Sequence, residues 1–185
     1  MKTTVCQLPD DTDELEEAWN RLVNHIKNEE SELVLLPEMP FHPWVAQSKK
    51  GNPEVWRRTV EKHERWQERL SELAPAVVLG SRPVIRRDRN LNEGFITEPD
   101  GTYTAAHHKF YLPQEQWFWE ASWYEPGKDD FTVYQSGEAE IGFLICTEMW
   151  VMNRAVDYGQ KGANIIATPR ATEQATTDKW ITGGR

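Results

Sequence analysis

Three side chains of the sequence could perform nucleophilic chemistry together: Glu38, Lys109 and Cys146. Glu38 lies just past the apolar residues 33–36, and Cys146 directly follows the nearly all-apolar residues 141–145. In open α/β sheets, functional groups gather where strands end at their carboxyl edge. A carboxylate beside a thiol can take its proton as attack begins, and a nearby ammonium favours the thiolate and stabilises an oxyanion. The pattern therefore predicts a cysteine nucleophile.

Each of these residues also has an ordinary structural explanation. A lone buried cysteine is more often a small apolar core residue than a nucleophile. We interpret Cys6, which lies inside a predicted strand, in that way. A glutamate after a strand is usually a solvated loop residue, and a lysine such as Lys109 could be a surface cation.

Two neighbouring histidines, His107 and His108, suggest a metal site at first sight. Adjacent residues of a strand point to opposite faces of the sheet, so the pair is a poor chelate. We therefore expect no metal.

The elements that must position these residues alternate between strands and helices, which favours a layered α/β domain. A helix is predicted to begin at the cap Asp11, because apolar residues follow at spacings of three and four. Asp100-Gly101 predicts a hairpin turn. The expected strands cover residues 5–8, 32–36, 76–79, 95–97, 103–105, 131–134, 141–145 and 164–167. The other expected helices cover residues 53–73 and 151–160, and a long aromatic loop covers residues 110–130.

The length and charge set further limits. The 185 residues suit a single domain over residues 1–185, and the net charge is −9. An acidic chain without a basic stripe is a poor partner for nucleic acid or an anionic membrane. The first residues lack the apolar stretch of a signal peptide, so we expect a cytoplasmic protein whose two cysteines stay reduced.

At these motifs the sequence resembles the nitrilase superfamily of carbon–nitrogen hydrolases. The matching segments are residues 33–38, 107–109 with 112–113, 124–127, 141–148 and 162–169. The resemblance implies an α-β-β-α sandwich with a Glu-Lys-Cys triad. Cys146 would be the nucleophile, Glu38 the general base and Lys109 the oxyanion stabiliser, with no cofactor.

The resemblance also implies two supporting groups. The second active-site glutamate of the family matches Glu120, with Glu115 as the reserve. The backbone N–H of Thr147 would share the oxyanion hole with Lys109. The aromatic residues of the loop around 117–124 would line the substrate pocket or form a lid or subunit contact.

The implied function is hydrolysis of a small amide, N-carbamoyl compound or nitrile through a cysteine thioester. Thr147 stands where the nitrilase branch usually has tryptophan, and residues 150–154 lack the Pro-Glu pair of many amidase branches. We prefer a linear amide. The alternatives are acyl transfer to an amine or alcohol, or a truncated and inactive binding or assembly protein. The chain ends where the family continues, so we expect a sandwich incomplete at its C-terminus and a homo-oligomer.

Overall fold

The larger of two main sheets carries the N-terminal half of the chain. The computed structural model describes residues 1–9, 11–172, 178 and 181–182. The larger sheet contains β1 (Thr3–Val5), β2 (Leu33–Glu38), β3 (Val77–Arg86), β4 (Arg89–Thr97) and β5 (Tyr103–His108), in that spatial order. Strands β1 to β3 are parallel, and β3 to β5 are antiparallel.

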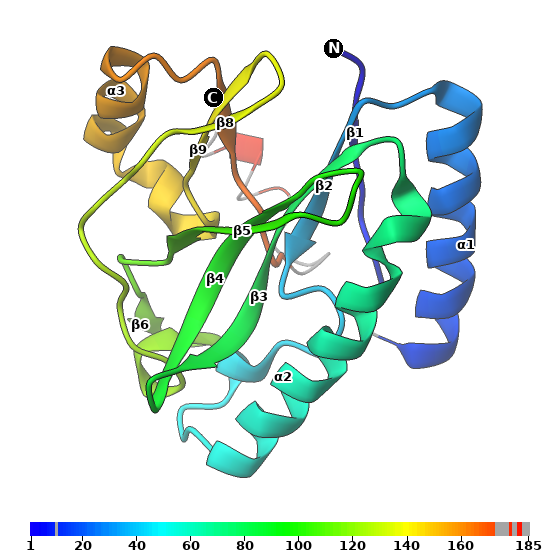
Figure 1. The fold of residues 1–185 in the computed structure, drawn as a ribbon. Coiled ribbons are helices and arrows are strands. Elements are labelled where there is room, and N and C mark those ends of the chain that lie inside the picture. Colours follow the sequence, from blue (N-terminus) through cyan, green and yellow to red (C-terminus); the bar gives the residue numbers. More distant parts are fainter. Residues whose placement is uncertain (10, 173–177, 179–180, 183–185) are drawn as a thin grey trace.

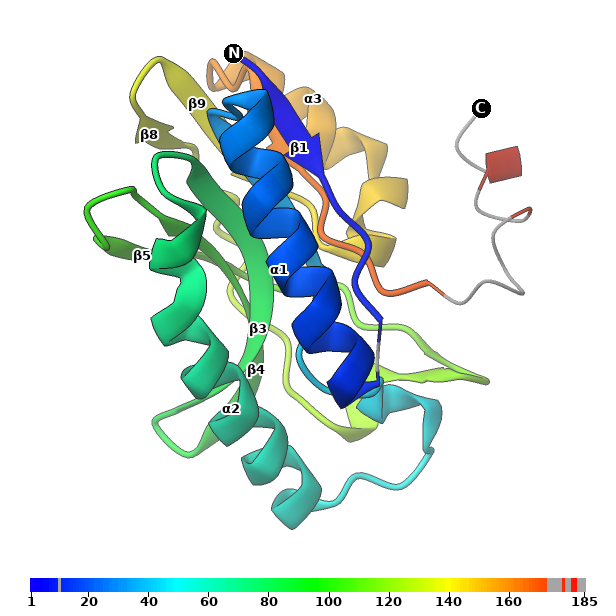
Figure 2. The same ribbon diagram turned by 90° about the vertical axis from the view of Figure 1, so that its right-hand side faces the viewer.

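The smaller sheet packs against the larger one. Its order is β10-β9-β8, made of β8 (Tyr134–Ser136), β9 (Ala139–Phe143) and β10 (Ile165–Ala167). Helices α1 (Thr12–Glu29) and α2 (Pro53–Gln67) cover the outer face of the larger sheet, and α3 (Met152–Gln160) lies on the far side of the smaller one (Figures 1 and 2). The predicted α-β-β-α sandwich is confirmed.

Separate apolar clusters hold these layers together. Helix residues such as Trp19 and Trp66 pack against Val34 and Phe95 of the larger sheet. A second cluster joins the two sheets and contains Leu33, Leu79, Ile96, Ala106, Ala139, Ile141, Phe143 and Ala167. Because β2, β5 and β9 meet across this second cluster, their ends lie close together.

Helix α1 forms as its sequence predicts. The Asp11 side chain accepts hydrogen bonds from the backbone N–H groups of Asp13 and Glu14, which caps the first turn. The helix buries one apolar face, made of Leu15, Ala18, Trp19, Leu22 and Ile26. The hairpin predicted at Asp100-Gly101 is also present, between β4 and β5. Among the described residues, no helix is both long and apolar enough to cross a bilayer.

The structure differs from the predicted elements in several places. Pro37 does not end its strand: β2 continues to Glu38 through an irregularity in its pairing with β3, where Glu38 pairs with Ser81. Such a bulge accommodates proline within a strand. Helix α2 ends at Gln67, and Glu68–Leu73 continues as a 3₁₀ helix.

The long hairpin of β3 and β4 fills residues 80–94, where no element was predicted between the expected strands 76–79 and 95–97. Its turn at Arg87 and Asp88 has positive φ at both residues and contains no glycine, so it lacks the usual sequence signal. The aromatic loop also contains structure: a small hairpin of β6 (Gln114–Glu115) and β7 (Phe118–Trp119), followed by a 3₁₀ turn, Glu120–Ser122.

Candidate active site

The ends of three strands bring Glu38, Lys109 and Cys146 together. Glu38 is the last residue of β2, and Lys109 directly follows β5. Lys109 Nζ lies 2.9 Å from Glu38 Oε1, and both side chains are fully buried. The Cys146 thiol is 1% exposed, and the charges of Glu38, Lys109 and Glu120 all act on its pKa. The three predicted residues therefore form one buried cluster.

Glu120 is a fourth member of this cluster. Lys109 Nζ lies 2.9 Å from Glu120 Oε1 and 2.7 Å from Oε2. The Tyr124 hydroxyl donates a hydrogen bond to Glu120 Oε2. The reserve position Glu115 lies exposed in β6, so it is Glu120 that joins the cluster.

Asn92 of β4 is a residue that sequence reasoning missed. Its side-chain Nδ2 donates to Glu38 Oε1 at 2.8 Å. Its main-chain carbonyl oxygen accepts from the main-chain N–H of Lys109 at 2.9 Å. The Ala171 N–H donates to the other oxygen, Glu38 Oε2, at 3.2 Å. Asn92 thus fixes both Glu38 and Lys109. Its sequence signal is weak, because Asn92 stands in the mixed stretch Asn90-Leu91-Asn92-Glu93.

Cys146 stands on a sharp turn of the backbone. Strand β9 ends at Phe143, so two residues separate it from Cys146, which begins a 3₁₀ turn, Cys146–Trp150. The φ of Cys146 is +50°, a left-handed conformation that costs a residue with a Cβ about 1 kcal/mol or more. Thr147 follows in the same turn, and its buried Oγ1 has no hydrogen-bond partner among the described residues.

The charges of the cluster oppose one another. Burial alone lowers the pKa of Lys109, but Glu38 and Glu120 outweigh it and raise that pKa above its usual value. Burial, together with the neighbouring Glu38 charge, raises the pKa of Glu120 to about 7 against the opposing effect of Lys109. The buried site therefore holds one ammonium between two carboxyl groups, of which Glu120 protonates more readily than usual.

The resting state of Cys146 is the thiol. Burial and the charge of Glu38 raise its pKa well above the ordinary value, although Lys109 lowers it. The sequence predicted that a nearby ammonium would favour the thiolate. In the structure, burial and Glu38 outweigh this effect of Lys109. Because the thiol keeps its proton, a base must remove that proton during attack, and Glu38 is the carboxylate whose charge acts most strongly on this thiol.

The two neighbouring histidines bind different carboxylates on opposite faces, as their positions predicted. His107 Nε2 lies 2.9 Å from Glu148 Oε2, whereas His108 Nε2 lies 3.0 Å from Glu93 Oε2. Within the part of the chain that the structure describes, no group of three or more His, Cys, Asp or Glu side chains is arranged to hold a metal ion.

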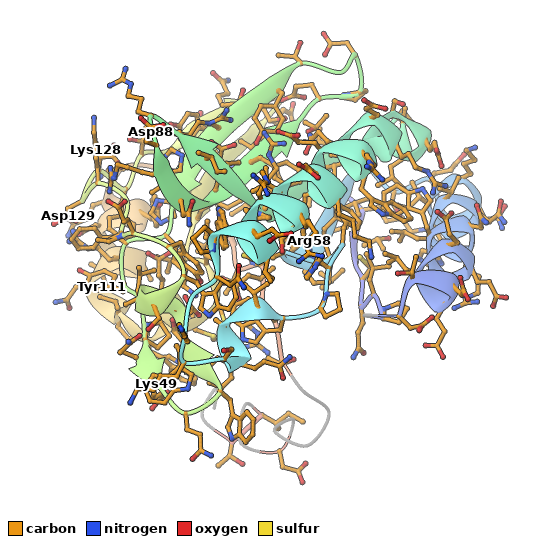
Figure 3. The ribbon with its side chains drawn as sticks, turned by 90° about the horizontal axis from the view of Figure 1, so that it is seen from below. Lys49, Arg58, Asp88, Tyr111, Lys128 and Asp129 are labelled. Carbon is orange, nitrogen blue, oxygen red and sulfur yellow. The ribbon has the colours of Figure 1, made fainter. Side chains whose placement is uncertain are left out.

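A cavity of about 750 Å³ reaches the cluster at Glu38. Its wall includes the aromatic side chains of Trp44, Trp117 and Phe118, together with His42 and Arg170. Trp117 and Phe118 belong to the β6–β7 region, where Lys49 lies near the hairpin (Figure 3), with its Nζ 4.9 Å from the centre of the Trp119 ring.

The rest of the aromatic loop is structural. Trp123 and Tyr124 are buried in a cluster with Trp56 and Val60 of α2. Trp117 and Phe118 of the loop therefore line the cavity, whereas Trp123 and Tyr124 pack in the core.

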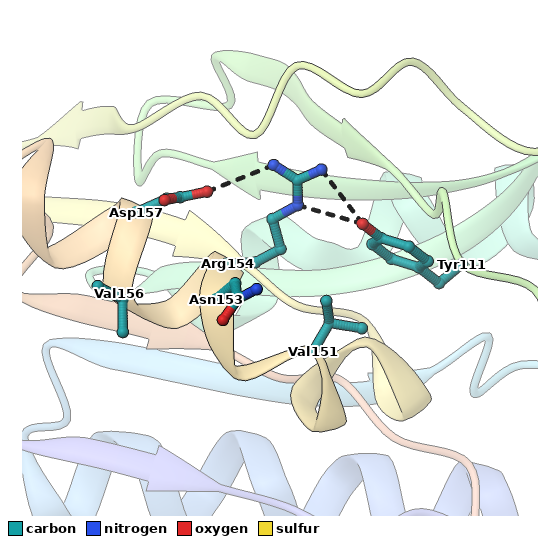
Figure 4. Close-up of a pocket in the computed structure, with 6 residues that line it drawn as sticks. All are labelled: Tyr111, Val151, Asn153, Arg154, Val156 and Asp157. Atoms are coloured by element: carbon teal, nitrogen blue, oxygen red, sulfur yellow. Dashed lines mark hydrogen bonds and ion pairs between the residues drawn. The ribbon is translucent and has the colours of Figure 1, made fainter.

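A second cavity, of about 450 Å³, lies at α3 and away from the cluster. Arg154 is one of the residues that line it (Figure 4). Its guanidinium donates to Tyr111 Oη at 3.2 and 3.3 Å and to Asp157 at 3.3 Å. Arg154 also pairs with Asp129, and its guanidinium lies 4.5 Å from the centre of the Phe131 ring. These contacts tie α3 to the loop beside it, which is a structural role.

Comparisons with known proteins show what the chain as a whole is similar to. The sequence family described as carbon-nitrogen hydrolase matches residues 2–182. An omega-amidase of Xenopus tropicalis is 26% identical over 162 residues, which cover 84% of this chain and 57% of that protein. N-carbamoylputrescine amidase of Solanum tuberosum is 30% identical over 80 residues, covering 43% of this chain and 27% of that protein.

Solved structures share the fold. A carbon-nitrogen hydrolase from Helicobacter pylori G27 superposes with a TM-score of 0.78 at 21% identity, over 98% of this chain and 64% of that one. An amidase from Nesterenkonia sp. AN1, described as carrying acrylamide on its active site cysteine by Michael addition, superposes with a TM-score of 0.75 at 16% identity, over 95% and 70% of the two chains. The chain thus spans less than two thirds of the length of the curated relatives it matches.

Proposed function

Since this chain belongs to the carbon-nitrogen hydrolase family, we propose that it cleaves a non-peptide carbon–nitrogen bond of a small molecule through a thioester on Cys146. One observation carries the proposal. A fully buried lysine joins two buried glutamates beside a buried thiol, at the end of a cavity. Burying three ionisable side chains is costly unless they are paired, which favours a chemical reason for the arrangement.

In the first half of the reaction, Glu38 takes the proton of the Cys146 thiol as sulfur attacks the carbonyl carbon of the substrate. The carbon–oxygen π pair moves to oxygen. Lys109 has three N–H donors and uses two on Glu38 and Glu120, so the third is available to this oxyanion. The Thr147 N–H is the proposed second donor.

The first half ends when the carbon–nitrogen bond breaks. The oxyanion reforms the carbonyl, and the leaving nitrogen takes the proton that Glu38 holds. Ammonia or an amine departs, and the acyl group stays on Cys146 as a thioester.

In the second half, water attacks the thioester while Glu38 takes one of its protons. The carbon–sulfur bond then breaks, the acid leaves, and the thiolate recovers its proton from Glu38. A single carboxylate thereby acts as base, acid and base again. Hydrogen bonds from Asn92 and Ala171 hold Glu38 in one orientation through these steps.

A linear amide is the proposed substrate class. The relatives named above are amidases, and the cavity combines aromatic walls with a few polar side chains, as small-molecule sites do. N-carbamoyl compounds and nitriles are the competing classes.

Ammonia release tests the proposal. The chain is assayed with panels of linear amides, N-carbamoyl compounds and nitriles, alongside the Cys146→Ala and Cys6→Ala variants. We expect activity on amides that is lost in Cys146→Ala and largely kept in Cys6→Ala, because the Cys6 thiol, although it lines the cavity, donates its hydrogen bond to the Leu35 carbonyl. Equal activity in the two variants would contradict the proposal.

Two further measurements separate hydrolysis from its alternatives. Hydroxylamine added as an acceptor yields a hydroxamate in place of the acid if the thioester is transferred. Acrylamide is the covalent probe: intact mass and peptide mapping are expected to show one adduct, on Cys146. A chain that neither releases ammonia nor forms the adduct would instead be an inactive binding protein.

A further inference from the structure

The Glu148 carboxylate links the two segments that carry Cys146 and Lys109. Glu148 is fully buried, two residues after Cys146. Its Oε2 accepts a hydrogen bond from the Ile145 N–H at 2.8 Å, directly before the cysteine. Its Oε1 accepts from the Phe110 N–H at 2.8 Å and the Tyr111 N–H at 3.4 Å, directly after Lys109.

His107 completes this link from the other side of Lys109. Its Nε2 lies 2.9 Å from Glu148 Oε2 and 3.2 Å from Oε1, and its side chain is 2% exposed. An ionised carboxylate only accepts hydrogen bonds, so Nε2 carries the proton. The imidazole is held in place by the Phe131 ring, whose centre is 4.9 Å away.

We propose that Glu148 and His107 are positioning residues that hold Cys146 and Lys109 in the relative positions that the reaction requires. This inference rests on the proposed function. Every hydrogen bond that the Glu148 carboxylate accepts within the described residues comes from His107 or from a main-chain N–H within two residues of Cys146 or Lys109. Glu148 thus acts through the backbone of the cluster, not on its side chains.

The strained conformation of Cys146 is the reason such a link is needed. A residue with a Cβ keeps a φ of +50° only where its surroundings fix it. The Glu148 side chain binds the Ile145 N–H, and the Glu148 N–H donates to the Ile145 carbonyl at 3.1 Å. These two bonds close the chain around Cys146 and Thr147. The Phe110 bond then ties this closed turn to the residue after Lys109.

The chain offers a matched control on the opposite face of β5. His108 also binds a buried glutamate, Glu93, at 3.0 Å. The other partners of Glu93 are Arg82, Arg86 and Tyr103, which are remote from the cysteine turn. Loss of His108 therefore removes the same kind of contact from the next residue without touching the link at Glu148.

The test compares Glu148→Gln, His107→Leu, His107→Gln and His108→Leu. A displacement of about 1 Å can cost about 10²-fold in rate. We expect kcat for amide hydrolysis to fall by about that factor in Glu148→Gln and His107→Leu, with KM changed less than about threefold. His107→Gln keeps an N–H donor and is expected to recover part of the rate, and His108→Leu to retain wild-type kcat.

Amide hydrogen exchange provides a readout that does not depend on activity. Exchange is expected to accelerate at residues 109–111 and 145–148 in Glu148→Gln and His107→Leu, but not in His108→Leu. Equal losses of kcat in His107→Leu and His108→Leu, or unchanged exchange at both segments, would overturn the inference. If Glu148→Gln does not fold, the two His107 variants decide the matter. If the wild-type chain has no amidase activity, the proposed function is contradicted, not this inference. Hydrogen exchange then still shows whether residues 109–111 and 145–148 are coupled.

Discussion

Lys109 and Glu38 form a completely buried ion pair, with 2.9 Å between Nζ and Oε1. The same ammonium also binds Glu120, so one positive charge is paired with two carboxyl groups whose side chains are buried. Removing one member of a buried ionic group leaves the charges of the others uncompensated. The resulting loss of folding free energy is larger than the net stabilisation that the intact group provides. Substitution of any one of these three side chains should therefore lower the stability of the protein as well as its activity.

Replacement of Lys109 by methionine tests this relationship. Without the ammonium, Glu38 and Glu120 face each other as buried carboxyl groups, and we expect the free energy of unfolding to fall by about 3–5 kcal/mol. The loss is expected to be larger at alkaline pH, where the raised pKa of Glu120 no longer keeps that side chain protonated. Ammonia release is expected to disappear, since an oxyanion donor alone contributes about 10²–10³-fold in kcat.

The control for this variant is Lys62→Met. Lys62 makes a single exposed hydrogen bond, to Thr12, and lies in α2 away from the cluster. Urea unfolding of the two variants at the same pH separates the buried lysine from a surface one. A loss below about 1 kcal/mol in Lys109→Met would show that the cluster is more hydrated than its burial implies.

Much of this arrangement follows from local sequence signals. The Asp11 cap, the periodic face of α1 and the Asp-Gly turn each act within a few residues, and each formed as predicted. The positions of Glu38 and Lys109 at strand ends follow from the same local patterns. The four-layer sandwich and the role of Glu120 required the resemblance to a family, because contacts between strands far apart in sequence leave no periodic signal.

The parts that were not predicted depend on long-range contacts. Pro37 continues a strand because the pairing with β3 shifts between Leu35 and Glu38. Asn92 reaches Glu38 across 54 residues of sequence, and Glu148 reaches His107 across 41. The raised pKa of Cys146 likewise comes from burial, which only the folded chain creates.

Glu120 is expected to make the protein less stable as pH rises from about 4.5 to about 7. Its pKa is raised by burial from 4.5 to about 7. Between these values the folded state keeps a proton that the unfolded state has lost, so the free energy of unfolding falls as pH rises, by up to ~1.4 kcal/mol per pH unit. The contribution is complete below the unfolded pKa and is lost above about pH 7.

The Glu120→Gln variant isolates this effect. Urea unfolding of wild type and variant is compared at several pH values between about 4.5 and 8. The stability of wild type relative to Glu120→Gln is expected to decrease across this window. Glu17→Gln, at a position 79% exposed, is the control and should follow wild type. A difference between wild type and Glu120→Gln that stays constant with pH would contradict the raised pKa.

His63 is expected to make the protein more stable as pH rises, which is the opposite of the effect of Glu120. It is buried, its Nε2 accepts a hydrogen bond from the Phe41 N–H at 3.2 Å, and its Nδ1 donates to the Thr59 carbonyl at 2.8 Å. Burial lowers its pKa from 6.5 to about 3. Between these values the unfolded state binds the extra proton, so stability rises with pH and is lost as pH falls through this range.

Comparison of His63→Gln with His25→Gln measures this contribution. His25 is exposed on α1 and should leave the pH dependence of stability unchanged. His63→Gln is expected to lose less stability than wild type on acidification from about pH 6.5. The effects of Glu120 and His63 oppose each other between about pH 4.5 and 6.5, so only the variants, and not wild type alone, resolve them. Parallel curves for the two histidine variants would mean that His63 titrates normally.

The protonation state of Cys146 decides how the nucleophile is generated. Burial and Glu38 keep its pKa well above normal, so we expect no thiolate absorbance in the difference between wild type and Cys146→Ala at neutral pH. Alkylation of Cys146 by a neutral amide-bearing reagent should then depend on Glu38, because that carboxylate must take the proton as sulfur attacks. Glu38→Gln is expected to slow this labelling to the rate of Cys6.

Cys6 serves as the internal reference within the same molecule. Burial raises its pKa to about 12, so both thiols are protonated at neutral pH and their ionisation does not distinguish them. A faster reaction at Cys146 must therefore come from the adjacent base. If Cys146 instead shows thiolate absorbance at neutral pH, and if Glu38→Gln labels as fast as wild type, then Lys109 controls the thiol directly and Glu38 acts only after attack.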